Sequence, residues 1–246
     1  EFATEKTVNN VTLADVEEFY RDYFVPANAY LIVIGDVTLD EVKTLTDTFF
    51  TSWTKAVPPS FSYSEPKNVP NTQINLVDMP NAVQSEITVQ NLVNLKMKDD
   101  DFIAALLANQ ILGGGSDSRL NLNLREDKGY TYGAYTSLGN DKYAPSRFTA
   151  SAEVRNMVTD SSIVEILKEL ELINAQPVTE KELKTTKALY AGSFIMALEN
   201  PQTIARYALN VEKEDLPKDF YKSFLEKLEN VSKADVELAA KKYFNV

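Results

Sequence analysis

Arg125 and Tyr132 are the residues of this chain whose types and spacing are best suited to chemistry. They lie seven positions apart in a segment that reads LREDKGYTY from Leu124 to Tyr132. A guanidinium and a phenol are both hydrogen-bond donors, and together they can bind a carbonyl oxygen or an oxyanion. The same residues can also be structural, because a basic last turn followed by glycine ends many helices and strand tyrosines usually pack. The spacing alone leaves both interpretations open.

The sequence contains no histidine and no cysteine. It therefore cannot form the Ser-His-Asp or Cys-His sets of hydrolases, a thiolate site or a histidine-ligated zinc site. Asp99, Asp100 and Asp101 are consecutive, and we interpret them as a solvated helix N-terminus rather than a cation site. We expect no metal or cofactor in this chain.

Three glycines, Gly113, Gly114 and Gly115, follow an apolar segment that predicts a helix over 102–112. Glycine readily adopts positive φ, so we expect these residues to end that helix. Ser116 or Asp117 would then cap a shorter helix over 118–127, which Gly129 would break before a strand. The glycines could instead form a flexible substrate-contact loop, but they are no phosphate loop because no Gly-Lys-Ser/Thr sequence follows.

Composition excludes several classes of function. The 246 residues are 44% hydrophobic, which suffices for one large domain or two smaller ones. A net charge of −11 argues against binding to nucleic acids or anionic membranes. No apolar run reaches the roughly 18–20 residues of a membrane span, and residues 1–20 show no signal peptide. We expect a soluble protein, cytoplasmic or periplasmic, with no nucleic-acid or membrane partner.

The two ends of the chain resemble each other. Residues 10–24 align without gaps on residues 230–244, and eight of the 15 pairs are identical. Each copy predicts a helix with a capping box, Thr12 with Asp15 and Ser232 with Asp235. Asn10 and Asn230 also begin glycosylation sequons, although capping explains the same Thr and Ser residues. The repeat predicts two homologous units of about 220 residues.

The predicted organisation follows from this repeat. Residues 1–56 would be the helix, strand and helix at the tail of a preceding unit, and residues 57–71 a Pro/Ser-rich linker. Residues 72–246 would be an α+β domain, truncated at its last strand. Strands are predicted over 29–35, 73–78, 84–93, 130–138 and 146–154, and further helices over 38–50, 161–174, 180–198, 202–211, 217–229 and 232–244. We expect a layered α+β fold with a sheet covered by helices on one face.

The motifs together resemble the insulinase/pitrilysin (M16) family of zinc metallopeptidases. The signature around the candidate pair includes Gly113–Gly115, Ser118-Arg119-Leu120, Leu124-Arg125-Glu126, Gly129 and Tyr132. Other landmarks are Tyr23–Asn28 before Leu31–Asp36, Val178–Leu183 and Leu198–Pro201. The resemblance covers nearly the whole chain and implies the LuxS/MPP-like fold of that family.

In active members of the family an inverted His-x-x-Glu-His motif binds zinc, and this chain lacks it. The resemblance therefore implies a non-catalytic C-terminal-type domain whose zinc lies on a partner half, fused or separate. Tyr132 would donate to the oxyanion and Arg125 would orient the peptide substrate. Gly113–Gly115 would correspond to the glycine-rich loop of processing-peptidase regulatory subunits. The parent assembly would be a zinc metalloendopeptidase. The alternative is a non-enzymatic structural or assembly subunit that retains the fold.

Overall fold

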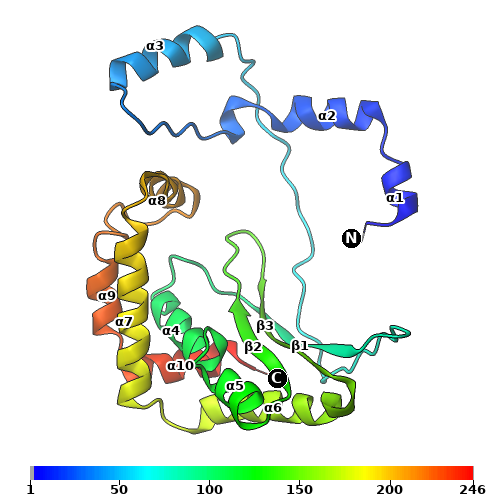
Figure 1. Cartoon of the computed structure of the whole chain (residues 1–246). Helices are drawn as coiled ribbons and strands as arrows, with labels where there is room; N and C mark the ends of the chain where they lie inside the picture. The colour runs from blue at the N-terminus through cyan, green and yellow to red at the C-terminus, as the bar shows by residue number, and fades with distance from the viewer. Residues whose placement is uncertain (1–2, 246) are drawn as a thin grey trace. The chain divides into compact units, whose positions relative to one another are not determined.

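The computed structural model describes residues 3–245, and the chain divides into two compact units (Figure 1). Unit 1 comprises the residues up to Ser64 together with Asn200–Leu209. Unit 2 comprises Glu65–Glu199 and the residues from Asn210 onward. The interpretation of the chain as the tail of one homologous unit followed by most of the next, with boundaries at 56 and 72, stays a prediction.

Up to Ser64, unit 1 consists of short helices joined by extended chain. These are α1 (Glu5–Asn9), α2 (Leu13–Tyr23), the 3₁₀ turn η1 (Pro26–Asn28) and α3 (Leu39–Phe50), and the rest of unit 1 is the first part of α8 (Pro201–Lys213). The capping boxes predicted for α2 and α3 are confirmed. The strand predicted over 29–35 is wrong, because these residues are extended but pair with no neighbouring strand among the described residues. β-branched residues favour a strand only where another strand supplies hydrogen-bond partners.

Unit 2 is built on a three-stranded antiparallel sheet in the order β1-β3-β2. The strands are β1 (Gln84–Val93), β2 (Thr131–Leu138) and β3 (Ser146–Arg155), so three predicted strands and the β2–β3 hairpin are confirmed. The strand predicted over 73–78 is wrong. That segment is exposed and unpaired, and the chain reverses after it in a turn where the Ala82 N–H donates to the Met79 carbonyl.

The helices of the second half follow the predicted order. They are α4 (Phe102–Gly113), α5 (Arg119–Asn121), the π-helical turn η2 (Leu122–Asp127), the 3₁₀ turn η3 (Asn156–Val158), α6 (Thr159–Ala175), α7 (Glu180–Ala197), α8 (Pro201–Lys213), α9 (Phe224–Asn230) and α10 (Lys233–Tyr243). The helix predicted over 217–229 starts only at Phe224, because tight turns occupy the preceding residues. Throughout residues 3–245, no helix combines the length and the apolar character that crossing a bilayer requires.

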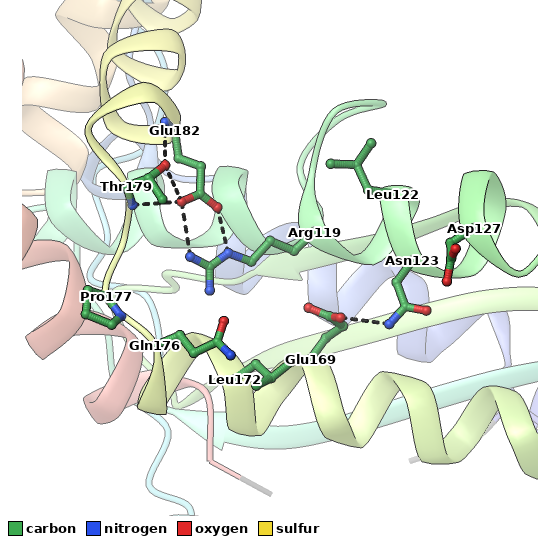
Figure 2. Close-up of a pocket in the computed structure, with 10 residues that line it drawn as sticks. All are labelled: Arg119, Leu122, Asn123, Asp127, Glu169, Leu172, Gln176, Pro177, Thr179 and Glu182. Carbon is green, nitrogen blue, oxygen red and sulfur yellow. Dashed lines mark hydrogen bonds and ion pairs between the residues drawn. The ribbon is translucent and has the colours of Figure 1, made fainter.

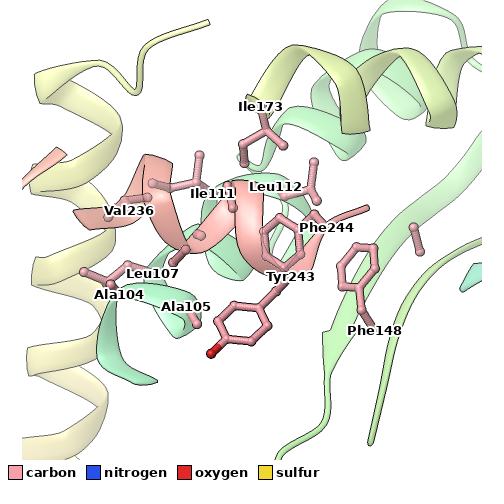
Figure 3. Close-up of a cluster of buried hydrophobic side chains, with 14 of the residues drawn as sticks. Ala104, Ala105, Leu107, Ile111, Leu112, Phe148, Ile173, Val236, Tyr243 and Phe244 are labelled. Carbon is pink, nitrogen blue, oxygen red and sulfur yellow. The ribbon is translucent and has the colours of Figure 1, made fainter. Parts of the chain in front are cut away.

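Helices cover one face of the sheet, which confirms the predicted α+β architecture (Figure 1). Ala150 and Ala152 of β3 point into the core and lie beside Thr136 and Ala134 of β2. Small side chains at the centre of a sheet let a helix approach closely. The core is completed from the far end of the chain, where the Phe244 ring lies 4.6 Å from the Phe148 ring (Figure 3).

Asp101, just before α4, binds two residues near the C-terminal end of unit 2. Its carboxylate accepts a hydrogen bond from the Lys242 Nζ at 2.7 Å and from the Tyr243 hydroxyl at 3.1 Å. Asp101 is the N-cap residue of α4, as predicted, but its side chain makes no capping bond and binds α10 instead. The bond from Asp101 raises the pKa of Lys242, and burial raises the pKa of the Tyr243 phenol. This cluster therefore fastens α10 to the start of α4.

The glycines at the end of α4 are needed for a reason other than positive φ. Gly114 caps the helix with ordinary right-handed angles, φ −83° and ψ −4°. At Gly113 a Cβ atom would lie 2.6 Å from the Thr136 backbone nitrogen on β2. The helix end thus needs glycine because it packs directly against the backbone of a strand.

We expect Gly113→Ala to lower the free energy of unfolding by about 1–3 kcal/mol, because the added methyl group meets backbone that cannot move aside. Gly192→Ala is the matched control, since it lies within α7 with nothing inside 4 Å of the added Cβ. Alanine there should stabilise by about 0.5–1 kcal/mol through helix propensity. Urea unfolding of both variants measures the difference, and equal effects would contradict the close-packing explanation.

Candidate functional site

Arg125 lies on a helical segment that changes type along its length. The helix predicted over 118–127 is present, but α5 gives way after three residues to the π-helical turn η2. The Lys128 N–H donates to the Asn123 carbonyl at 2.9 Å, five residues back. Gly129 then takes φ +61° and ends the segment, as predicted. π-Helical turns are rare and occur often at functional sites.

The start of this segment differs from the prediction. Ser118, rather than Ser116 or Asp117, occupies the N-cap position, and its side chain makes no capping bond. Its hydroxyl donates instead to the Gly115 carbonyl at 2.6 Å. The Asn121 amide donates to the same carbonyl at 2.9 Å, so two side chains hold the last of the three glycines. A substrate-contact role for the glycines stays a prediction.

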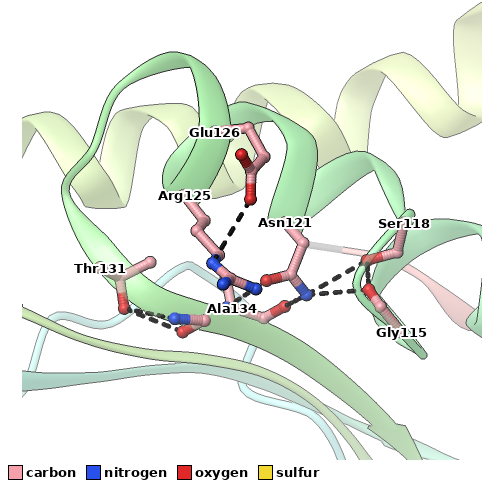
Figure 4. A network of polar contacts seen from close by, with 8 residues as sticks. Gly115, Ser118, Asn121, Arg125, Glu126, Thr131 and Ala134 are labelled. Atoms are coloured by element: carbon pink, nitrogen blue, oxygen red, sulfur yellow. Dashed lines mark hydrogen bonds and ion pairs between the residues drawn. The ribbon is translucent and has the colours of Figure 1, made fainter.

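Asn121 links this helical segment to the edge of the sheet (Figure 4). Its side chain is fully buried, donates to the Ala134 carbonyl at 2.8 Å and accepts from the Ala134 N–H at 3.3 Å. These are the two bonds that a residue of a fourth strand would make. The Asn121 amide therefore supplies hydrogen-bond partners to the Ala134 backbone at the edge of the sheet. These bonds fix the distance between β2 and the helical segment.

Arg125 and Tyr132 are both accessible to solvent. The Arg125 side chain is 45% exposed, and its one ion pair among the described residues joins Nε to a Glu126 carboxylate oxygen at 3.4 Å. In Figure 4 Arg125 and Asn121 project from the same segment toward β2. Tyr132 is 91% exposed, beside an irregularity in the β2–β3 register between Thr131 and Ala134. Both donor groups are thus free to meet another molecule.

Arg119 belongs to a separate, structural contact. Its guanidinium binds both carboxylate oxygens of Glu182, with Nε at 2.7 Å and Nη2 at 3.1 Å (Figure 2). Glu182 also accepts bonds from the backbone and hydroxyl of Thr179, which form the predicted capping box of α7. Burial alone raises the pKa of Glu182, but the bonds from Arg119 and Thr179 outweigh it and lower the pKa to about 2.

A hollow of about 470 Å³ lies beside this ion pair (Figure 2). Across it the Asn123 amide donates to Glu165 at 2.9 Å and to Glu169 at 2.7 Å, and the first bond lowers the pKa of Glu165. The lining residues are Arg119, Leu122, Asn123, Asp127, Glu169, Leu172, Gln176, Pro177, Thr179 and Glu182. Most of the polar groups that line this hollow already bond to one another. We therefore interpret the hollow as a junction between helices.

A second hollow, of about 590 Å³, lies on the face of the sheet opposite the core. Its strand residues are mainly Ser, Thr, Gln and charged side chains, namely Glu86, Thr88, Gln90, Ser137, Ser146, Arg147, Thr149 and Ser151. The adjoining loop is ordered by Asp141, whose carboxylate accepts the backbone N–H groups of Tyr143 and Ala144, and these bonds lower its pKa. Neither hollow is lined by Arg125 or Tyr132.

The residues present do not fit a zinc site. The sequence offers no imidazole or thiolate, and the part of the chain that the structure describes holds no group of three acidic side chains able to share a metal ion. Zinc in proteins is bound mostly by such nitrogen and sulfur ligands. Arg125 and Tyr132 carry exposed hydrogen-bond donors.

The sequence analysis missed two contacts that hold the motif in place. Asn121 is a polar residue between two leucines in a helix, and that is a signal for a buried hydrogen-bonding role. Arg119 and Glu182 lie 63 positions apart, so no local pattern indicates their pairing. Sequence spacing identified the exposed residues of the motif but not those that hold it in place.

Comparison with protein families identifies a related group. The model described as "Peptidase M16 inactive domain" matches residues 10–190. A "Probable inactive metalloprotease YmfF" of Bacillus subtilis (strain 168) is 22% identical over 237 residues, covering 96% of this chain and 54% of that protein. A "Zinc protease PqqE" of Helicobacter pylori is 24% identical over 245 residues, covering 96% of this chain and 53% of that protein. The chain thus spans about half the length of these relatives.

Solved structures show the same fold. The crystal structure of a peptidase M16 inactive domain from Pseudomonas fluorescens superposes with a TM-score of 0.87 at 23% identity. The match covers 98% of this chain and 57% of that one. The helix and strand arrangement described above is therefore shared along almost the whole chain.

We expect Asn121→Leu to lower the free energy of unfolding by about 2–4 kcal/mol, because leucine keeps the volume but leaves the Ala134 N–H and carbonyl without their side-chain partners. Asn71→Leu is the control, since Asn71 is exposed, and its effect should stay within about 0.5 kcal/mol. Chemical denaturation measures both. Similar losses at the two positions would show that the Asn121 bonds add nothing.

A pH-dependent prediction follows from Glu182. Its ordinary pKa is 4.5 and its folded value about 2, so its charge stabilises the fold fully above pH 4.5 and this contribution disappears as the pH falls toward 2. Glu182→Gln should cost about 2–3 kcal/mol at pH 7 and much less near pH 2.5. Glu180→Gln, at an 82% exposed side chain, should change stability little at either pH. A pH-independent deficit for Glu182→Gln would refute this account.

Proposed function

Because the chain belongs to the family of peptidase M16 inactive domains, we propose that it is the non-catalytic, substrate-binding half of a zinc endopeptidase. It supplies Arg125 and Tyr132 to a zinc site carried by a partner domain or subunit. Tyr132 donates a hydrogen bond to the oxyanion that forms on the scissile carbonyl, and Arg125 orients the peptide backbone beside it. Hydrolysis itself takes place on the metal of the partner.

One observation carries this proposal: within residues 3–245, neither Arg125 nor Tyr132 hydrogen-bonds through its side chain to another element of the fold. Gly113 packs on a strand, Arg119 binds Glu182, and Asn121 binds the sheet edge. Arg125 has only an exposed ion pair of the kind that contributes little stability, and the Tyr132 hydroxyl makes no hydrogen bond within residues 3–245. Exposed donors beside a rigid π-helical turn are suited to act on a substrate rather than on the fold.

The separation of metal and donors is chemically reasonable. Peptide hydrolysis needs an activated water and, separately, donors placed where negative charge develops in the transition state. Two halves that close around a peptide can bring the two together only when substrate is enclosed. The polar hollow on the open sheet face, to which β2 contributes Ser137, offers Ser and Thr side chains that can hydrogen-bond to the backbone of an extended peptide.

We expect Arg125→Ala and Tyr132→Phe each to lower kcat/KM of the assembled peptidase by about one to three decades, the usual effect of losing an oxyanion donor. Because both side chains are exposed, the melting temperature of the chain should not change. The assay mixes this chain with its zinc-bearing half and follows cleavage of a fluorogenic peptide.

Tyr135→Phe and Lys168→Ala are the matched controls. Each removes one exposed hydroxyl or one exposed positive charge from the same unit, and both should leave kcat/KM within twofold. Wild-type turnover by Arg125→Ala and Tyr132→Phe would end the donor role and favour the alternative of a structural or assembly subunit.

A further inference from the structure

The strand that carries Tyr132 contains a bulge. The β2–β3 register shifts by one residue between Thr131 and Ala134, so that Tyr132 and Gly133 on β2 lie opposite Glu153 alone. An extra residue of this kind interrupts the alternation of side chains and re-aims one of them, and such bulges are frequent beside active sites. The bulge therefore decides where the Tyr132 phenol points.

A regular strand would bury Tyr132. Alternate residues of a strand point to the same face, so Tyr132 would share the face of Ala134 and Thr136, which are at most 9% exposed. With the bulge, Tyr132 is instead 91% exposed. The bulge thus converts a core position of the strand into an accessible hydrogen-bond donor.

The Thr131 hydroxyl replaces ladder bonds that the bulge interrupts. Its oxygen accepts the Gly133 N–H at 3.1 Å (Figure 4). The hydroxyl donates its proton to the Glu153 carbonyl on β3 at 2.6 Å, and the Gly133 carbonyl at 2.9 Å is a second acceptor within reach. A hydroxyl has one proton and two lone pairs, so this single side chain can bond to both strands at once. These bonds hold the backbone on either side of Tyr132.

The chain around the bulge is fixed as well. After the bulge, Asn121 binds both backbone groups of Ala134. Before it, the Tyr130 N–H donates to the Leu124 carbonyl at 2.8 Å. Leu124 directly precedes Arg125 in the sequence, so this bond closes the loop between the two donors at a point next to both of them.

We propose that Thr131 is a positioning residue for Tyr132. Its hydroxyl holds the bulge in one conformation, and this conformation aims the phenol at the scissile carbonyl that Arg125 helps to orient. Thr131 itself touches no reacting atom and acts only through Tyr132. The inference rests on the donor role proposed above for Arg125 and Tyr132.

The competing explanation is that Thr131 only stabilises the strand. Its loss would then lower activity by the same factor whatever side chain stands at position 132. A double-mutant cycle separates the two explanations, because a residue that acts through the Tyr132 hydroxyl has no further effect once that hydroxyl is removed.

The first measurement is kcat/KM of the full chain mixed with its zinc-bearing half. Thr131→Val replaces the hydroxyl with a methyl group, and we expect it to lower kcat/KM by about tenfold to a hundredfold, as for a displaced catalytic donor. Thr131→Ser keeps the hydroxyl and should stay within about threefold of the wild type. In the Tyr132→Phe background, Thr131→Val should lower kcat/KM by no more than about twofold.

The matched control is Thr185→Val, which makes the same chemical change at an exposed position of α7. It should leave kcat/KM within about twofold of the wild type. Circular dichroism checks that each variant folds. Thr131→Ala takes the place of Thr131→Val in every measurement if the valine variant does not fold.

The second measurement needs neither partner nor substrate. Amide hydrogen exchange, followed by NMR on the full chain, reports directly on the Gly133 N–H. This N–H should exchange at least about tenfold faster in Thr131→Val than in the wild type, and Thr131→Ser should restore its protection.

Two results would overturn the proposal. One is an equal fall in kcat/KM on Thr131→Val with and without Tyr132→Phe, which would assign to Thr131 a general role in strand stability. The other is an unchanged exchange rate at the Gly133 N–H, which would show that the hydroxyl does not hold the bulge.

The same experiments separate this inference from the proposed function. If Tyr132→Phe lowers turnover but Thr131→Val does not, the donor role stands and the positioning role falls. If Tyr132→Phe turns over like the wild type, the donor role ends and the positioning role ends with it.

Discussion

Hydrogen bonding at the edge of a small sheet is the constraint on which this domain depends. The sheet of unit 2 has three strands, so two of them are edges whose backbone groups need partners. Asn121 supplies both bonds to Ala134 on β2, and Asn68 likewise donates to the Leu92 carbonyl and accepts from its N–H on β1. On each edge strand, a side-chain amide thus hydrogen-bonds to both backbone groups of one residue. The amide of Asn121 also fixes the helical segment that carries Arg125.

Some residues in and beside the motif stabilise the fold, whereas Arg125 is an exposed donor. Gly113 and Asn121 hold the segment between α4 and β2, and the Arg119–Glu182 pair fastens it to α7. These contacts are buried or partly buried, so they position the backbone firmly. Arg125 remains exposed on the π-helical turn that this framework supports. The framework fixes the backbone that carries Arg125, while the free side chain still loses rotamer entropy when it binds another molecule.

The same helical element appears twice in the chain with opposite burial. In α10 the element is part of a core, and its last residues close that core through Phe244 and Tyr243. In α2 the equivalent aromatic residues form an open surface. Apolar area removed from water is the main source of stability for such contacts. One sequence pattern is therefore buried in α10 and exposed in α2.

The sequence by itself determined the helices, their capping boxes, three strands and the helix-covered sheet, because local periodicity and side-chain capping depend on neighbouring residues. It also offered Arg125 and Tyr132 as candidate donors, although their spacing alone left a structural role equally open. Only the tertiary structure decided which predicted strands form, since residues 29–35 and 73–78 have strand-like sequences but find no partner strand within residues 3–245. It likewise decided the pairing of Arg119 with Glu182, which lie 63 positions apart in the chain. Long-range pairing is set by packing, and no local pattern records it.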